Sequence, residues 1–304
     1  MPPAAGGSPP ARGTGFDGLP GWSRSKCIVH IPTGGNINQT PQQTWRSPRH
    51  GVPIQRFGAV SSTIDLAQLQ APLVGAAGLL IVADQQTSGR GTRGRAWQSP
   101  AGSLAVTFVG PGIGRPELGL LVGMAAVNAI GDMLEALGAA TRPRLRWPND
   151  VVVAVGTGWA KVAGCLTQVV GKPGSTTILA SVGINVNNDP GQLGAGLRTP
   201  AASLRQVAGQ DIDPVQLADC LADNLKEAVQ APLHVEVLAR AEAMLAALGE
   251  VVTVRGPGGL VGGRVLGLSP DGGLRLKCAD EREEVVRFSA EIIDPARECS
   301  DDAE

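Results

Sequence analysis

Arginine and glycine alternate within one short loop, which reads GRGTRGRAW over residues 89–97. The planar guanidinium of arginine carries five N–H donors that suit carboxylates and phosphates, and glycine lets a backbone approach a ligand closely. The spacing therefore predicts an anion-binding loop that uses Arg90, Arg93 and Arg95. The chain of 304 residues has a formal net charge of -1, so this basic cluster is local and its partner should be local too.

Four further polar clusters stand at predicted strand ends or in loops. They are Ser62-Thr63, Trp147-Pro148-Asn149-Asp150, Lys161 with Gly164, and residues 183–187. Each cluster alone has a simple structural explanation, because serine caps helices, a WPND sequence commonly forms a turn, and a lysine on a strand usually marks a solvated edge. Their occurrence together, in order along one chain, indicates a single site.

Hydrophobic periodicity predicts the elements that position these clusters. Ser62 and Asp65 have the spacing of a capping box, which predicts the start of a short helix. Apolar runs over 78–83 and 103–109 predict one strand that enters the arginine loop and one that leaves it. Over 116–137 the apolar positions recur at three and four residues, which predicts an amphipathic helix ended by Gly138.

The middle of the chain is predicted to form an antiparallel meander, because apolar stretches over 145–155, 160–170 and 176–184 are separated by glycine-marked turns. Helices are expected over 200–207, 214–229 and 235–248, the second with Asp213 as N-cap and Pro214 at its first position. From residue 250 the apolar period changes to two, which predicts a small β-barrel. The fold class is therefore α+β with a C-terminal barrel.

Composition divides the chain into four parts. Residues 1–53 are rich in Pro, Gly, Ser, Thr and Gln without a sustained apolar period, which predicts a disordered N-terminal extension. A catalytic domain is expected over 54–249, the barrel over 250–294 and a tail over 295–304. The extension has one acidic residue beside five Lys and Arg, which is compatible with mitochondrial or plastid targeting, although no amphipathic helix accompanies it. A cytoplasmic location is the default expectation.

Several classes of site and protein are disfavoured. Five cysteines stand far apart without a C-x-x-C pair, which argues against a zinc site or a disulfide framework and for a reducing compartment. The sequence contains no run of 18 apolar residues, so we expect no membrane span. Nucleic-acid binding is disfavoured because three arginines in a neutral chain are a weak electrostatic footprint.

Taken together, the motifs resemble the biotin protein ligase (holocarboxylase synthetase) family. The matching stretches are Ser62-Thr63-Ile64, QTSGRGTRGRAWQSP over 86–100, RWPND over 146–150, KVAGCL over 161–166 and GINVN over 183–187. The stretches VVTVRGPG and LSPDGGLRLK also match the C-terminal barrel of that family, so the resemblance covers residues 55–293. Five motifs in the same order make the match specific.

The resemblance implies a mixed, antiparallel-rich sheet like that of class II aminoacyl-tRNA synthetases, followed by an SH3-like barrel. It also implies a two-step reaction with biotin, ATP and Mg²⁺. Biotinyl-5′-adenylate forms first, and the biotinyl group then passes to a lysine of the biotin carboxyl carrier domain of acetyl-CoA carboxylase or a related carboxylase. Positioning and cations dominate the catalysis of such transfers. A homodimer is compatible with this family.

Residue roles are implied by the motif match alone. Biotin would be held by Ser62, Thr63, Gln86, Arg90 and Lys161. ATP and the adenylate would contact Arg93, Arg95, Trp97, Asn149 and Asn185. The catalytic residues would be Lys161, Arg90 and Asp150, and Asp150 would also be the Mg²⁺ ligand.

The sequence departs from the family pattern at several positions, among them the stretch PAASL over 200–204, where the family has P-T-x-S-L. Thr92 stands where the family usually has arginine, Arg146 replaces the lysine of K-W-P-N-D, and Ile64 replaces the asparagine after Ser-Thr. If the guanidinium missing at position 92 normally helps to close the loop over the intermediate, this protein should release biotinyl-adenylate more readily.

Three alternative functions compete with biotin ligation. A lipoate or octanoate ligase shares the catalytic fold but does not usually show the G-R-G-x-x-G-R-x-W-x-S-P loop. A DNA-binding, biotin-responsive regulator needs a helix-turn-helix, and residues 1–53 show no such period. A non-catalytic biotin binder is disfavoured by the retained Lys161 and Asp150.

Overall fold

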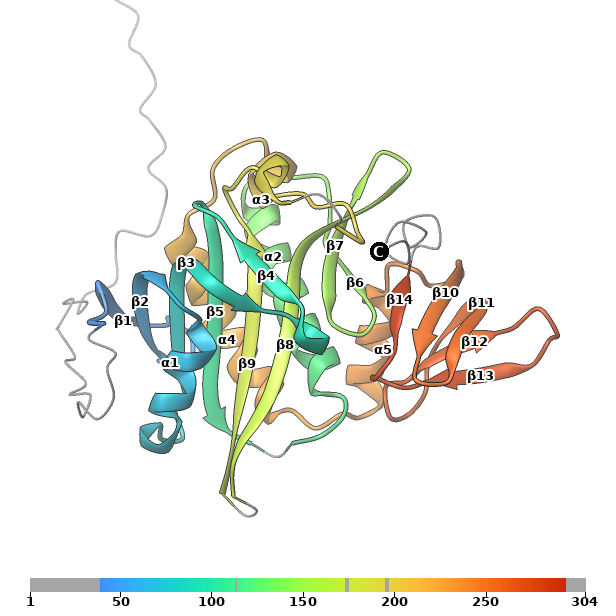
Figure 1. The fold of residues 1–304 in the computed structure, drawn as a ribbon, viewed down its shortest axis with the longest axis horizontal. Coiled ribbons are helices and arrows are strands. Elements are labelled where there is room, and N and C mark those ends of the chain that lie inside the picture. Colours follow the sequence, from blue (N-terminus) through green and yellow to red (C-terminus); the bar gives the residue numbers. More distant parts are fainter. Residues whose placement is uncertain (1–38, 113, 173–174, 195–196, 294–304) are drawn as a thin grey trace, which may run out of the picture.

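Among the residues that the computed structural model describes, 39–112, 114–172, 175–194 and 197–293, nine strands form one mixed sheet (Figure 1). Its order is β1-β2-β3-β5-β9-β8-β7-β6, with β4 paired to β3 outside this path. β2 and β3 run parallel, and the other neighbouring pairs run antiparallel. The strands are β1 (Gln43–Arg46), β2 (Pro53–Val60), β3 (Leu79–Arg90), β4 (Ala96–Ser99), β5 (Ser103–Pro111), β6 (Arg144–Arg146), β7 (Asp150–Val155), β8 (Gly158–Lys172) and β9 (Ser175–Asn185).

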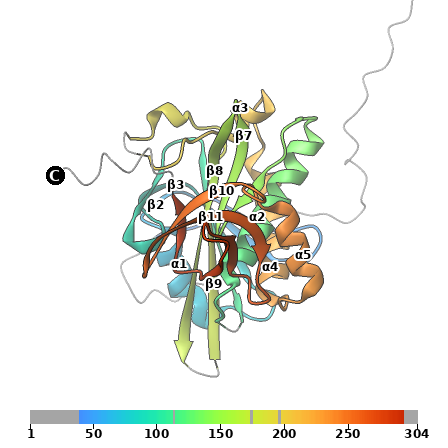
Figure 2. The ribbon, with the colours of Figure 1, turned by 90° about the vertical axis from the view of Figure 1, so that its right-hand side faces the viewer.

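Helices cover both faces of this sheet. Figure 2 shows α2, α4 and α5 on one side and α1 on the other. The α-helices are α1 (Thr63–Gln70), α2 (Leu118–Ala136), α3 (Leu204–Ala208), α4 (Pro214–Gln230) and α5 (Val235–Met244), and the 3₁₀ turns are η1 (Ala71–Leu73), η2 (Thr92–Gly94) and η3 (Pro190–Gln192). The predicted α+β class is confirmed.

Two apolar cores follow from this layering. The larger core packs α2 and α4 against the sheet, and the smaller core packs α1 against residues such as Phe57, Ile81 and Leu179. Along β9, Leu179 belongs to the α1 side and Ala180 to the α2 side, as strand alternation requires. Helix α2 is long and apolar enough to cross a bilayer, but 72% of its most apolar window is buried within the protein.

The helix boundaries test the capping predictions. Asp213 caps α4 by accepting a hydrogen bond from the Val215 N–H at 2.8 Å, and Gly138 follows the end of α2 with φ +73°. Ser62 caps α1 by accepting from the Ile64 N–H, but Asp65 contacts Arg90 and Ser61 instead of completing a capping box. The helix predicted over 200–207 is shorter than expected, because Ser203 caps it and it begins at Leu204.

A separate antiparallel sheet follows α5 in the described part of the chain. It has five strands in the order β13-β12-β11-β10-β14. They are β10 (Val251–Gly256), β11 (Gly259–Leu268), β12 (Leu274–Lys277), β13 (Glu283–Val286) and β14 (Glu291–Ile293). The buried indole of Trp147 fastens this sheet to the first, because it donates to the Gly272 carbonyl at 3.1 Å and stacks on Phe288 with ring centroids 5.7 Å apart.

The N-terminal prediction needs correction from residue 39 onward. Residues 43–46 form β1. Carboxylates on α4 bind the segment that follows β1. Ser47 donates to Asp223 at 2.6 Å, and the His50 imidazole lies 2.6 Å from Glu227. The sequence did not reveal this order because the partners are more than 170 residues away. Residues 1–38 and the predicted tail over 295–304 lie outside the described residues.

One carboxylate on α4 should make stability depend on pH. The Trp45 indole N–H donates to Asp219 at 2.7 Å. Burial raises the pKa of Asp219 to about 6, against the opposing effect of that hydrogen bond. The carboxyl group of Asp219 therefore binds a proton more tightly in the folded state than in the unfolded state. Above pH 6 its ionisation lowers the free energy of unfolding, and this destabilisation disappears as the pH falls toward 4.

Asp219→Asn removes that ionisation and keeps an oxygen for Trp45. We expect the free energy of unfolding to rise by about 1 kcal/mol at pH 8, after discounting for solvent screening, and to match the unmutated protein near pH 4. Chemical denaturation between pH 4 and 8 measures the difference, with exposed Asp211→Asn as the control. A gain that is the same at both ends of the range would contradict the pKa argument.

Candidate active site

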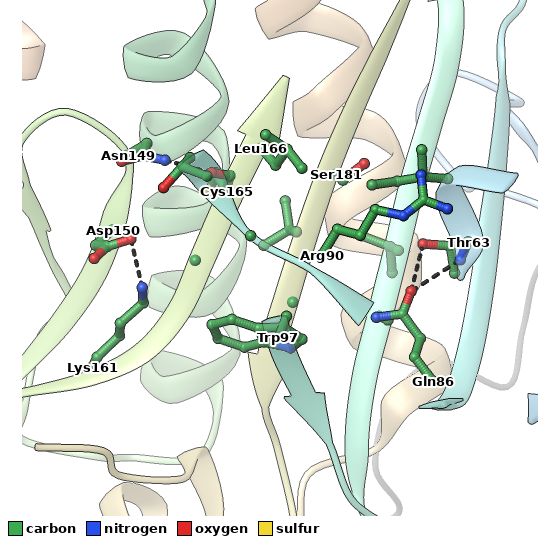
Figure 3. A pocket seen from close by; sticks show the side chains of 18 residues that line it. Thr63, Gln86, Arg90, Trp97, Asn149, Asp150, Lys161, Cys165, Leu166 and Ser181 are labelled. Carbon is green, nitrogen blue, oxygen red and sulfur yellow. Dashed lines mark hydrogen bonds and ion pairs between the residues drawn. The ribbon is translucent and has the colours of Figure 1, made fainter. Parts of the chain in front are cut away.

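A pocket opens on the α1 side of the large sheet, where the five sequence clusters meet (Figure 3). Thr63 and Gln86 lie on one side, Asp150 and Lys161 on the other, and the Trp97 ring lies between them. The elements that contribute are α1, β3, η2, β4, β5, β7, β8 and β9. A second, wider hollow adjoins this pocket and reaches the C-terminal sheet, with Arg146, Asn185, Arg198 and Glu291 in its walls.

Lys161 is the cation on the Asp150 side of the pocket. It lies on β8, and its Nζ is 2.8 Å from the carboxylate of Asp150 at the start of β7. In the pairing of β7 and β8, Asp150 lies opposite Gly164 and Val152 lies opposite Lys161, so the two charged side chains approach each other diagonally. The Nζ also lies 5.4 Å from the centre of the Trp97 ring, within cation–π range. The predicted catalytic pair is therefore brought together.

Thr63 and Gln86 form the opposite wall. The Gln86 carbonyl oxygen accepts from the Thr63 backbone N–H at 2.9 Å and from the Thr63 hydroxyl at 3.2 Å. Ser62 is fully buried as the cap of α1 and is absent from the described residues that line the pocket, so its predicted contact with biotin stays a prediction.

Each arginine of the loop faces a carboxylate of the protein itself. Arg90 pairs with Asp65 on α1. Arg93 and Arg95 both pair with Glu291 on β14, at 2.5 and 2.8 Å, and Arg198 reaches the other oxygen of that carboxylate at 3.1 Å. Burial alone would raise the pKa of Glu291, but the surrounding arginines outweigh it and hold that pKa below its usual value. The anions that these arginines face in the structure are therefore side chains of the protein itself.

Trp97 rests on two glycines of neighbouring strands. Gly164 and Gly183 are paired across β8 and β9. A Cβ at Gly164 would come within 3.0 Å of both the indole and the Lys161 side chain, and a Cβ at Gly183 would overlap the indole. An added methyl group would meet the indole at either position, most severely at Gly183, so these glycines leave room for the ring on the sheet. The indole N–H is buried without a hydrogen-bond partner among the described residues.

The two asparagines have separate surroundings. The side-chain amide of Asn149 donates to the Cys165 carbonyl, which ties the WPND turn to β8. Asn185 is buried at the end of β9, and its carbonyl oxygen accepts from Asn188 at 3.3 Å. Both residues line the wider hollow together with Arg95 and Trp97, whereas Arg93 is not among the described residues that line it.

The chemistry that these groups support is electrostatic. Burial, and next the charge of Asp150, raise the pKa of the Cys165 thiol far above its usual value, so this cysteine is not a thiolate nucleophile. Within the described ranges no group of three or more His, Cys, Asp or Glu side chains is placed to hold a metal. Among the described residues that line the pocket between Thr63 and Lys161, Asp150 is the single carboxylate.

Several site residues were missed from sequence. In the sequence, Asp65 carries only the signal of a helix cap, and Glu291 lies 196 residues beyond Arg95. Thr107 and Ser181 stand in predicted strands without a further sequence signal, although Ser181 lines the pocket and its hydroxyl lies 2.9 Å from that of Thr107. Strand alternation was the available signal, because Ser181 and Gly183 share one face of β9.

Two family models match the chain. The model described as the biotin/lipoate A/B protein ligase family matches residues 59–187, and the model of the biotin protein ligase C-terminal domain matches residues 247–292. Together they span more than half of the chain. This protein belongs to the biotin protein ligase family.

Curated members of this family are similar over part of their length. The biotin--[acetyl-CoA-carboxylase] ligase of Paracoccus denitrificans is 35% identical over 149 residues, which cover 47% of this chain and 59% of that protein. The bifunctional ligase/repressor BirA of Bacillus subtilis is 36% identical over 142 residues, which cover 45% of this chain and 41% of that protein. The chain thus spans about half the length of the curated relatives it matches.

A solved biotin protein ligase has the same fold. The structure from Aquifex aeolicus in complex with biotin and ATP is 26% identical, with a TM-score of 0.64, and the match covers 79% of this chain and 97% of that one. The α+β architecture of this family member therefore agrees with both the sequence pattern and the solved fold.

Gly183→Ala should expel Trp97 from its position on the sheet. The added methyl group would overlap the indole, and such overpacking typically costs about 1–3 kcal/mol. We expect acrylamide to quench one more of the five tryptophans, measured by steady-state fluorescence. Gly158→Ala on β8 is the matched control, because its Cβ would meet open space. Equal quenching in both variants would contradict the conclusion that Gly183 makes room for the Trp97 ring.

Proposed function

We propose that this protein is an ATP-dependent biotin protein ligase. It forms biotinyl-5′-adenylate from biotin and ATP and transfers the biotinyl group to a lysine of the biotin carboxyl carrier domain of acetyl-CoA carboxylase or a related carboxylase. The observation that carries the proposal is the convergence of Lys161, Gln86 and Arg90 on one pocket that opens into a second, arginine-lined hollow. The solved relative named as bound to biotin and ATP supports the same pair of substrates.

In the first step, a carboxylate oxygen of biotin attacks the α-phosphorus of ATP, and the bond to the β-phosphate breaks as pyrophosphate leaves. Lys161 would lie against the biotin carboxylate and the α-phosphate, where its charge opposes the negative charge that accumulates in the transition state. Thr63 and Gln86 would hold the biotin ring, with Ser62 behind them. Arg90 would exchange Asp65 for the substrate carboxylate.

Arg93 and Arg95 would bind ATP phosphates in place of Glu291. Trp97 would separate the biotin side from the nucleotide side, with Asn149 and Asn185 next to the nucleotide. In the second step, the lysine amine of the carrier attacks the acyl carbon, the bond to AMP breaks, and the amine loses a proton. Asp150 would orient that amine, since it already pairs with one ammonium group, that of Lys161.

Magnesium fits this site as a partner of the nucleotide. Mg²⁺ usually takes one or two protein carboxylates together with substrate phosphates and water. Asp150 would supply that carboxylate, and the bound ion would add positive charge beside the phosphates. Without the phosphates, the described residues offer no complete metal site.

The finer architecture and the cellular context belong to the same proposal. The large sheet would be of the class II aminoacyl-tRNA-synthetase type, over 54–249, and the second sheet would be an SH3-like barrel over 250–294, as its antiparallel order suggests. We expect a cytoplasmic location, with organellar targeting through the N-terminal extension as the alternative, and a homodimer as a further possibility. The match to a biotin protein ligase C-terminal domain argues against a lipoate or octanoate ligase.

The decisive experiment combines the full chain with biotin, ATP, Mg²⁺ and an apo carrier domain. Mass spectrometry should find one biotinyl group on the acceptor lysine. Lys161→Ala should slow adenylate formation by about 10²–10³-fold, as expected when a group that stabilises transition-state charge is removed. Lys172→Ala, also on β8 but exposed at its far end, is the matched control. Transfer of octanoate instead of biotin, or full activity of Lys161→Ala, would refute the proposal.

Thr92→Arg tests whether the intermediate is held weakly. The Thr92 hydroxyl accepts from Arg95 at 2.9 Å, and an arginine at this position would add a fourth guanidinium to the loop. We expect the release of biotinyl-adenylate in a single-turnover trap to slow by about tenfold, the effect of one charge-assisted hydrogen bond. Ser88→Arg places the same charge on the exposed part of β3 as a control. An unchanged release rate in Thr92→Arg would exclude weak retention through this residue.

A further inference from the structure

Three hydroxyl groups form a continuous chain beside the pocket. The Thr63 and Thr107 hydroxyls are 2.8 Å apart, and the Thr107 and Ser181 hydroxyls are 2.9 Å apart. They come from α1, β5 and β9, and all three residues are buried, with Ser181 at 8% exposure. The side chain of Gln86 continues this hydrogen-bonded series beyond Thr63.

The direction of this chain is determined by its first member. The Thr63 backbone N–H can only donate, so the Gln86 atom 2.9 Å from it must be the carbonyl oxygen. That oxygen can only accept, so the Thr63 hydroxyl 3.2 Å away donates its single proton to it. Thr63 must then accept from Thr107, and Thr107 must accept from Ser181.

The chain therefore leaves two complementary groups on the pocket. Ser181 has committed its proton to Thr107, so its oxygen is an acceptor at the pocket wall. The Gln86 amide nitrogen has two protons, one of which goes to the Ser99 hydroxyl at 3.3 Å. Its nitrogen is turned toward the pocket in Figure 3. One acceptor and one donor in the same pocket match a ligand that presents an N–H beside a carbonyl.

We propose that Ser181 is a substrate-binding residue that accepts a hydrogen bond from a ureido N–H of biotin, and that Thr107 is a positioning residue that holds the Ser181 hydroxyl in the accepting orientation. The inference rests on the proposed function and explains how the site would select a cyclic urea. Lipoate and octanoate carry no N–H at the end that enters the pocket, so they cannot satisfy Ser181. Hydrogen bonds in a chain also polarise one another, which strengthens the terminal acceptor.

The test measures binding to the full chain by isothermal titration calorimetry without ATP. The probes are biotin and the two cyclic carbamate analogues in which one or the other ureido N–H is replaced by oxygen. We expect Ser181→Ala to weaken biotin binding by about 3- to 10-fold, the worth of one neutral hydrogen bond. The same variant should leave unchanged the binding of the one carbamate that lacks the N–H facing Ser181.

Thr107→Val keeps the side-chain volume but frees the Ser181 proton to point into the pocket. We expect it to reduce the preference for biotin over that carbamate by about 3- to 10-fold, because Ser181 can then donate to the ring oxygen. A purely structural role for Thr107 would weaken all three ligands equally. Thr177→Val, on β9 but outside the lining of the pocket, is the matched control, and thermal denaturation verifies that each variant is folded.

The outcomes separate this inference from the proposed function. If the unmutated protein neither binds biotin nor forms the adenylate, the proposed function fails. If it does both, but Ser181→Ala binds biotin as well as the unmutated protein or loses affinity equally for all three ligands, the role of Ser181 is overturned and the proposed function stands. Loss for biotin, with one carbamate unaffected, supports the inference.

Discussion

Four cationic side chains converge on one region of the α1 face, and their mutual repulsion must be balanced before any ligand arrives. The protein balances them with its own carboxylates. Lys161 pairs with Asp150, Arg90 with Asp65, and Arg93 and Arg95 share Glu291. These carboxylates come from β7, α1 and β14, so the charge balance ties together the three elements that surround the site. A substrate anion would then replace an internal one, with little change in the net charge of the pocket.

The two strands β8 and β9 supply the surface on which these charges are arranged. Their antiparallel pairing places Gly164 beside Gly183, and the absence of side chains there makes room for the Trp97 ring. Ser181 lies two residues before Gly183 on the same face of β9, and it ends the hydrogen-bonded chain that begins at Gln86. The Ser181 hydroxyl and the glycine platform for Trp97 thus lie on the same sheet as Lys161 and Asp150, and placement on regular strands favours preorganisation.

Local features of the chain were predictable because their causes are local. Asp213 caps α4 and Gly138 follows α2 as expected, since a cap and a left-handed glycine act within a few residues. The two strands that the apolar runs predict also appear, but β3 continues through Arg90 and pairs with the unpredicted strand β4, so the loop itself is shorter than expected. The order of residues 39–53 was missed, because a segment without apolar periodicity is held by carboxylates of α4 that are distant in sequence.

The sequence by itself determined the α+β class, the arginine loop between two strands and the set of motifs that mark the family, because side-chain chemistry and periodicity are properties of short stretches. Only the tertiary structure decided which anion each arginine faces. The pairing of Arg95 with Glu291 spans 196 residues and depends on how the C-terminal sheet docks on Trp147. The direction of the hydroxyl chain was likewise undetermined, because a serine or threonine becomes a donor or an acceptor only through the neighbours that folding brings to it.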